Sequence, residues 1–147
     1  MNLLAKLVRR FLLVKEIVSK TGQVHFRRWR LLQTPWFAIY IHQICRSDME
    51  LDMHDHPWNF SSVILEGAYR EASSYPPKFD KIHIRDYYSG DVIEHQAEDV
   101  HKLTLVSQEV WTLVFTSGRT RYWGYQTKAG WIGHQEYRQL KNEGRLR

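Results

Sequence analysis

The strongest chemical signal in this sequence is the segment MHDHPW at residues 53–58. In an extended strand, side chains two residues apart share a face, so His54 and His56 point the same way while Asp55 points the opposite way. Two imidazoles on one face can bind a single metal ion together with one or two further ligands. Asp55 is better suited to a supporting hydrogen bond. The spacing therefore predicts a metal site that takes another ligand from elsewhere in the chain.

The elements that position this segment are predicted to be strands. From residue 24 onward, short runs rich in aromatic and β-branched residues, such as WFAIYIHQI and VWTLVFT, alternate with turn signals. Many short strands at even spacing, without a helical pattern between them, indicate a closed barrel or a sandwich. We therefore expect one all-β domain over residues 23–135, preceded by a helical segment at 1–22 and followed by a polar tail, a frayed helix or loop, at 136–147.

Residues 2–20 are predicted to form an amphipathic helix, because apolar residues recur at helical spacing and basic residues fill the other face. Gly22 is a typical helix stop. Two interpretations stay open. The helix docks on the outside of the domain, or its basic face contacts nucleic acid, a membrane or a protein partner.

Composition places the chain among ordinary globular proteins. It has 147 residues, enough for one domain with a real core, and is 43% hydrophobic and 25% charged. The single cysteine, Cys45, excludes an internal disulfide and a Cys-rich zinc site. The net charge of +5 permits nonspecific attraction to anionic surfaces, but no established DNA-reading motif is present. Without a signal-peptide cleavage site or an apolar run of about 18 residues, we expect a cytoplasmic protein.

Two spacings in the chain resemble the two motifs of the cupin superfamily. In the first motif a Gly stands about eleven residues after the second His, as Gly67 stands after His56. The second motif begins with Gly-Asp and ends in a His eleven residues after that Gly, as the segment from Gly90 to His101 does. The resemblance spans roughly residues 36–125. It extends to small uncharacterised cupins of bacteria and phages through HDHPWNF, GAYRE and TLVFTSGRTRYWGY.

This resemblance implies a single RmlC-like cupin β-barrel, a double-stranded β-helix or jelly roll. It also implies that His54, His56 and His101 bind one divalent metal ion. Phe60 stands where many cupins carry a glutamate, so the resemblance supports three histidine ligands and no carboxylate. Such a set leaves positions open for water, O₂ or substrate. It is similar to the three-histidine iron site of thiol dioxygenases, which favours Fe(II), with Zn, Ni or Mn as the alternatives.

Three further residues are candidates for acid–base chemistry. Tyr69 and Glu71 share a strand face: turned inward they would serve as proton donor and acceptor, and turned outward they would form an ordinary cross-strand pair. His95, with its neighbour Glu94, is a candidate fourth ligand or acid–base group, although a surface position is the stronger expectation. His42 is a lesser candidate for lining the barrel.

Arg119, Arg121 and Trp123 also share a face, and they are candidates for binding a carboxylate or phosphate of a substrate. The alternative is cation–π and salt-bridge packing on the exterior. The function expected is an Fe(II) dioxygenase-like enzyme acting on a small polar molecule, with a metal-dependent isomerase or lyase as the second enzyme class. A non-catalytic metal- or small-molecule-binding or accessory protein is the alternative. Exposed strand edges make a homodimer the expected assembly.

Overall fold

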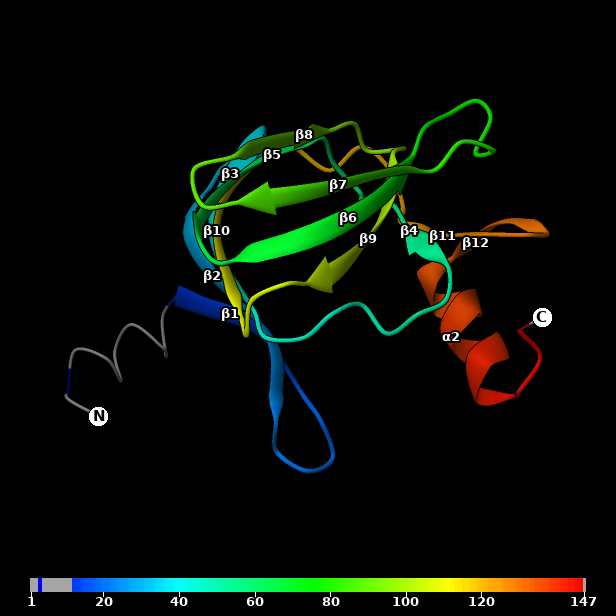
Figure 1. Ribbon diagram of the computed structural model, residues 1–147, viewed down its shortest axis with the longest axis horizontal. Coiled ribbons are helices and arrows are strands. Elements are labelled where there is room, and N and C mark those ends of the chain that lie inside the picture. Colours follow the sequence, from blue (N-terminus) through cyan, green and yellow to red (C-terminus); the bar gives the residue numbers. More distant parts are fainter. Residues whose placement is uncertain (1–2, 4–11, 147) are drawn as a thin grey trace.

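Two antiparallel sheets of six strands each form the computed structural model, which describes Leu3 and residues 12–146 (Figure 1). The first sheet has the order β1 (Leu13–Val18), β2 (Val24–Gln33), β3 (Phe37–Ile44), β10 (Val110–Ser117), β5 (Phe60–Glu66) and β8 (Val92–His95). The second has the order β12 (Gly130–Gly133), β11 (Gly124–Thr127), β4 (Met53–His54), β9 (Val100–Leu105), β6 (Ala68–Ser74) and β7 (His83–Tyr88).

The core lies between the two sheets. Its residues alternate along the strands with less buried ones, as the sequence pattern predicts. Along β10, every second residue from Val110 to Thr116 is buried, while the residues between them are less so. Val110 packs with residues from β5, β6 and β8 in one cluster: Ile64, Tyr69 and Ile93. A smaller cluster on β3, β5 and β10 contains Ala38, Tyr40, Phe60 and Val114. The sheets therefore pack face to face, and their inner faces carry the site described below.

The predicted closed barrel is wrong in one respect. Among the described residues, hydrogen-bonded pairing ends at β1 and β8 in one sheet and at β12 and β7 in the other, so the sheets form an open sandwich. The prediction of a mainly β fold is confirmed. The strands form two separate sheets instead of one continuous ring of paired strands.

The helix predicted over residues 2–20 is also wrong over Leu13–Val18. Leu13–Val18 form strand β1, which pairs antiparallel with β2. Gly22, at φ 83°, makes the turn between the two strands, and the β-branched residues Val14, Ile17 and Val18 favour the extended backbone. Residues 1–2 and 4–11 of the predicted segment lie outside the described residues.

The polar tail contains an ordered helix, α2 (His134–Asn142), packed on the second sheet (Figure 1). Tyr137 is 3% exposed and stacks on Tyr125 of β11, with ring centroids 3.9 Å apart. Its hydroxyl donates to Oδ2 of Asp52 at 3.0 Å. In the part of the chain that the structure describes, no helix has the length and apolar character needed to cross a membrane.

Candidate metal centre

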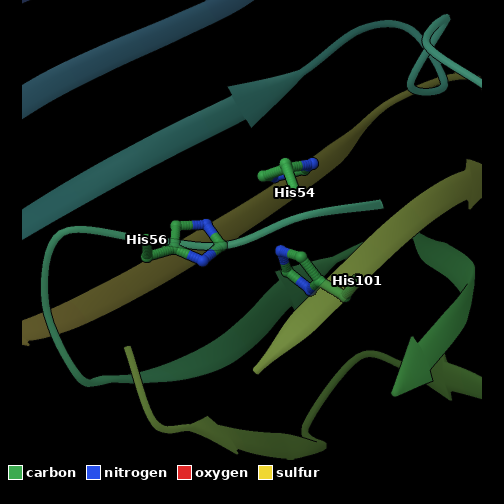
Figure 2. A group of neighbouring side chains, drawn as sticks. All are labelled: His54, His56 and His101. Carbon is green, nitrogen blue, oxygen red and sulfur yellow. The ribbon is translucent and has the colours of Figure 1, made fainter. Parts of the chain in front are cut away.

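Three histidines from different parts of the chain meet in the interior. His54 lies in β4, His56 follows in the next loop, and His101 lies directly opposite His54 on β9. The ring centroids of His54 and His56 are 5.1 Å apart, and each lies 4.8 Å from that of His101. One ligand nitrogen from each ring lies within 4.8 Å of the others (Figure 2). The three rings surround a common space in which one metal ion could be bound.

Asp55, between the two histidines, holds this segment in place from its other side. It is 1% exposed, and its Oδ1 accepts a hydrogen bond from the backbone N–H of Gly124 at 2.6 Å. Its Oδ2 accepts from Nε1 of Trp131 at 2.8 Å and from the guanidinium of Arg121. The carboxylate therefore ties the metal-site segment to β11 and β12, the supporting role that strand parity suggested.

Glu71 links His101 to a fourth buried histidine. Nδ1 of His101 lies 2.8 Å from one oxygen of Glu71, and Nε2 of His95 lies 3.0 Å from the other. Glu71 is 2% exposed and His95 is 3% exposed. Because a carboxylate accepts, each ring donates to it. Nδ1 of His101 is thus engaged, and Nε2 is left to face the other two ligands, as carboxylate-supported histidine ligands in metal sites do.

The contacts of Glu71 with His101 and His95 favour the charged forms of both Glu71 and His95. Burial by itself would raise the pKa of Glu71, but the hydrogen bonds from His101 and His95 outweigh it and lower the pKa to about 2. Burial would lower the pKa of His95, but the hydrogen bond and charge of Glu71, and then the charge of Asp99, raise it. The carboxylate is therefore ionised in the interior, where the two imidazoles compensate its lost hydration.

The other two histidines are held neutral. Burial, followed by the neighbouring imidazole of His101, lowers the pKa of His54 to about 4. Burial and the neighbouring imidazoles also hold the pKa of His56 well below its usual value. A metal ligand must carry a free nitrogen lone pair, so neutral rings are the form that binds an ion.

The residues fit a divalent transition metal. Three imidazoles suit Zn, Fe, Ni or Cu, and Nδ1 of His56 is buried with no hydrogen-bond partner among the described residues. Glu71, His95 and His101 form a second group of close donors, but the oxygens of Glu71 already accept from both rings. The set of His54, His56 and His101 is therefore the better ligand set, with Glu71 supporting it.

Phe60, at the position where the cupin resemblance would place a glutamate ligand, packs against the histidines of the site. Its ring centroid lies 4.7 Å from that of His56, 5.3 Å from that of His95 and 6.0 Å from that of His101. The apolar ring of Phe60 has no atom that can bind a metal ion. Phe60 therefore adds no ligand to the three histidines.

A cavity of about 440 Å³ opens beside the three histidines. Its walls come from both sheets and include aromatic residues (Phe26, Trp58, Phe60, Tyr69, Trp123 and Tyr125) and several charged ones. A volume of this order suits a small organic molecule.

The structure brings the three acid–base candidates into the interior. Tyr69, Glu71 and His95 are all buried, so the inward alternative for Tyr69 and Glu71 holds. The surface position expected for His95 is wrong, because β8 alternates and turns Ile93 and His95 inward while Glu94 is exposed. Burial and then the charge of Glu71 raise the pKa of Tyr69, which lines the cavity.

Of the three candidate substrate-binding residues, one lines the cavity and two do not. Trp123 lines the cavity, as does His42, whereas Arg119 and Arg121 do not. The guanidinium of Arg121 is bound to Asp55, and that of Arg119 lies 5.2 Å from the ring centroid of the exposed Tyr122. This placement matches the exterior alternative, and a substrate-binding role for the two arginines stays a prediction.

Among the residues not singled out from the sequence are two basic residues that matter for the charge of the cavity. Arg28 of β2 and Lys15 of β1 line the cavity, but Lys15 fell within the segment predicted to be a helix. The segment VHFRRWR could have indicated the position of Arg28, because side chains two residues apart in a strand share a face and Phe26 therefore lies on the same face as Arg28.

Comparison with known proteins found similarity among solved structures only. No family model matches the sequence, and no curated protein matches it. Among solved structures, the iron(II) form of HppE is similar with a TM-score of 0.56 at 11% identity, over 69% of this chain and 54% of that one. The hydroxypropylphosphonic acid epoxidase from S. wedmorenis gives a TM-score of 0.52 at 11% identity, over 69% and 55%.

KdgF from Halomonas sp. is similar with a TM-score of 0.50 at 13% identity, over 71% of this chain and 87% of that one. This chain thus spans about half the length of the first two proteins and most of the third. At these identities the similarity concerns the fold, and it does not single out the small bacterial and phage cupins. The chain has a cupin-type β-sandwich fold.

Proposed function

We propose that this protein is a metal-dependent enzyme that binds one divalent ion through His54, His56 and His101 and acts on a small polar molecule in the adjoining cavity. The observation that carries the proposal is the convergence of three imidazoles whose ligand nitrogens lie within 4.8 Å of one another. The contact of His101 Nδ1 with Glu71 supports it, because metal-ligating histidines commonly donate their other ring N–H to a carboxylate.

Fe(II) is the ion that we favour. Three protein ligands leave coordination positions open, which distinguishes a catalytic site from a closed structural one. A bound iron(II) ion would supply O₂ chemistry of the kind that dioxygenases use. The similar fold of HppE, which has been solved with Fe(II) and with Co(II), is consistent with this choice.

The remaining residues of the chain would bind and orient the substrate. Tyr69 stays protonated because its pKa is raised, so its hydroxyl can donate a hydrogen bond or a proton within the cavity. Trp58, Trp123 and Tyr125 supply rigid apolar walls that hold a small molecule and exclude water. Glu71 and His95 would keep His101 in its orientation without touching the substrate.

Metal analysis of protein purified without a His-tag tests the metal site. We expect close to one equivalent of a divalent ion in the wild type after reconstitution, and a large loss of metal in His101→Ala. His83→Ala is the matched control, because His83 is exposed on β7 and outside both groups of close donors. Equal metal content in wild type and His101→Ala would overturn the three-histidine site.

Oxygen consumption separates the enzyme from its alternatives. Iron-loaded protein should consume O₂ in the presence of small carboxylates or phosphate esters, and His54→Ala should abolish this consumption. Metal-dependent turnover without O₂ uptake would indicate the isomerase or lyase class instead. Full metal binding with no turnover of any kind would identify a non-catalytic metal- and small-molecule-binding protein.

A further inference from the structure

The cavity beside the three histidines also contains an arginine that the proposed metal chemistry does not use. Arg28 projects from β2 into this cavity, and Lys15 from the neighbouring strand β1 lines it as well. We propose that Arg28, assisted by Lys15, is the subsite that binds an oxyanion of the substrate, a carboxylate or a phosphate. The inference rests on the proposed function and names the class of substrate.

The guanidinium of Arg28 is held in a fixed position. Its Nε donates to Nε2 of His42 at 2.9 Å. Its central carbon lies 5.0 Å from the ring centroid of Tyr40 and 5.6 Å from those of Trp58 and Phe26. Aromatic faces attract a guanidinium and restrict its rotamers, so little conformational entropy remains to be lost when a ligand binds.

Arg28 has no acidic partner among the described residues. Within residues 12–146, no carboxylate lies within ion-pair distance of it, although it is half-buried. A cation removed from water without a counter-ion costs free energy, and burial accordingly lowers the pKa of Arg28. An anionic ligand in the cavity would supply the missing counter-charge to the guanidinium N–H groups that face no acceptor among the described residues.

The acidic residues of the cavity lining are engaged elsewhere. Asp55 accepts from Trp131 and Arg121, as described above. Glu50 accepts from Nζ of Lys141 at 2.7 Å, and Asp48 accepts from the backbone N–H of Leu103 at 2.8 Å. None of these three carboxylates lies within ion-pair distance of Arg28, so the wall of the cavity beside Arg28 keeps its positive charge.

Lys15 adds a second positive charge at the same wall. Its Nζ lies 5.8 Å from the ring centroid of Phe26, the same ring that Arg28 contacts. Lys15 stands opposite Arg28 in the pairing of β1 with β2, and burial, followed by the positive charge of Arg28, lowers the pKa of Lys15. A guanidinium fork beside an ammonium group is suited to a carboxylate or a phosphate.

The position of Arg28 relative to the metal centre sets the kind of substrate. Trp58, on which Arg28 packs, follows His56 by two residues, and both line the same cavity. A small molecule within about 440 Å³ would thus place its anionic group on Arg28 and its remaining atoms toward the three histidines. Aromatic walls between the two favour a short organic body over a free inorganic anion.

Ligand-observed NMR titration of zinc-loaded protein tests the subsite with three probes: propionate, ethyl phosphate and the neutral propionamide. We expect propionate or ethyl phosphate to bind at least about tenfold more tightly than propionamide, since charge-assisted hydrogen bonds supply this difference. Preference between the two anions identifies the carboxylate or the phosphate. Arg28→Gln should reduce anion affinity by at least about tenfold, and Arg28→Lys by less, because it keeps the charge.

Arg30→Gln is the matched control, because Arg30 is an exposed residue of the same strand outside the cavity lining. It should leave anion binding unchanged. Metal content measured on the same samples should be equal in wild type and Arg28→Gln, which separates failure of the subsite from failure of the metal site. Circular dichroism establishes that each variant is folded.

Two results would overturn the subsite. One is equal anion affinity, including no measurable binding, in wild type and Arg28→Gln. The other is anion binding that survives Arg28→Gln and disappears in His101→Ala, which would place the anion on the metal. Absence of metal with Arg28-dependent anion binding retained would overturn the proposed enzyme and leave an anion-binding protein.

Discussion

Nδ1 of His101 and Oε2 of Glu71 lie 2.8 Å apart in the interior of the sandwich, and Glu71 has no exposed surface of consequence. The contact joins β9 to β6, and the register of these strands explains it. Ser73 stands opposite His101, and Glu71, two residues away along β6, lies on the same inner face. The orientation of His101, a candidate metal ligand, is therefore determined by strand pairing between segments 30 residues apart.

Replacement of Glu71 by Gln tests this relationship. The amide has one oxygen that accepts, so it can satisfy His101 or His95 but not both. We expect a loss of metal affinity of about 10- to 100-fold, the usual effect of removing such a supporting group. Chelator competition measures the affinity. Glu94→Gln is the control, because Glu94 is exposed and bonded only to Ser61 among the described residues. Unchanged metal affinity in Glu71→Gln would show that the carboxylate does not position the ligand.

Replacement of Phe60 by Glu should create a fourth ligand. A carboxylate at this position would face His56, at a cost of about 2 kcal/mol or more in the metal-free protein from lost packing and an unpaired buried charge. Metal binding should restore much of this loss, because a ligand that binds the folded state stabilises it. The thermal melting temperature should therefore rise more on zinc addition in Phe60→Glu than in wild type.

Phe60→Gln is the matched variant for this experiment. It loses the same packing but introduces no negative charge, so zinc should raise its melting temperature no more than it does in wild type. An equal rise in Phe60→Glu and Phe60→Gln would mean that residue 60 does not reach the metal.

The three histidines that the structure brings together could be predicted from the sequence, because their spacing reflects local geometry and a family pattern. Side-chain alternation is enough to bring His54 and His56 to one face, and the cupin spacing identified His101. The burial of Tyr69 followed from the same alternation once the inner face of β6 was known.

What could not be predicted depends on pairing between distant segments. The pattern of Leu13–Val18 is compatible with a helix as well as a strand, and only pairing with β2 decides between them. The partner of Arg121 is Asp55, 66 residues earlier, so sequence alone could not show that this guanidinium is engaged. The role of Arg28 likewise depends on the cavity that both sheets form.

Asp55→Asn should lower the free energy of unfolding substantially. Removing one charge of a buried, hydrogen-bonded pair costs about 3–5 kcal/mol, and water offsets part of this because the Arg121 side chain is 28% exposed. We therefore expect a loss of about 2–3 kcal/mol in urea denaturation. Asp86→Asn, in the exposed pair with Arg70, is the control and should have little effect. Equal losses in the two variants would contradict a structural role for Asp55.

Alanine substitutions at Gly67 and Gly90 distinguish the cost of backbone strain from the cost of steric crowding, because the two glycines have similar φ angles but different surroundings. Gly67 and Gly90 have φ of 89° and 94°, so alanine at either position adopts an unfavourable left-handed conformation that costs about 1–2 kcal/mol. A Cβ on Gly67 would lie 2.3 Å from the carbonyl oxygen of Glu109, whereas a Cβ on Gly90 would meet nothing within 4 Å. Gly67→Ala should consequently destabilise the protein by a further ~1–3 kcal/mol relative to Gly90→Ala, as overpacking does. Urea denaturation of the two variants measures the difference. Equal stability would mean that the loop from Ser107 to Glu109 moves aside at no cost, so the tight turn after β5 would not depend on glycine.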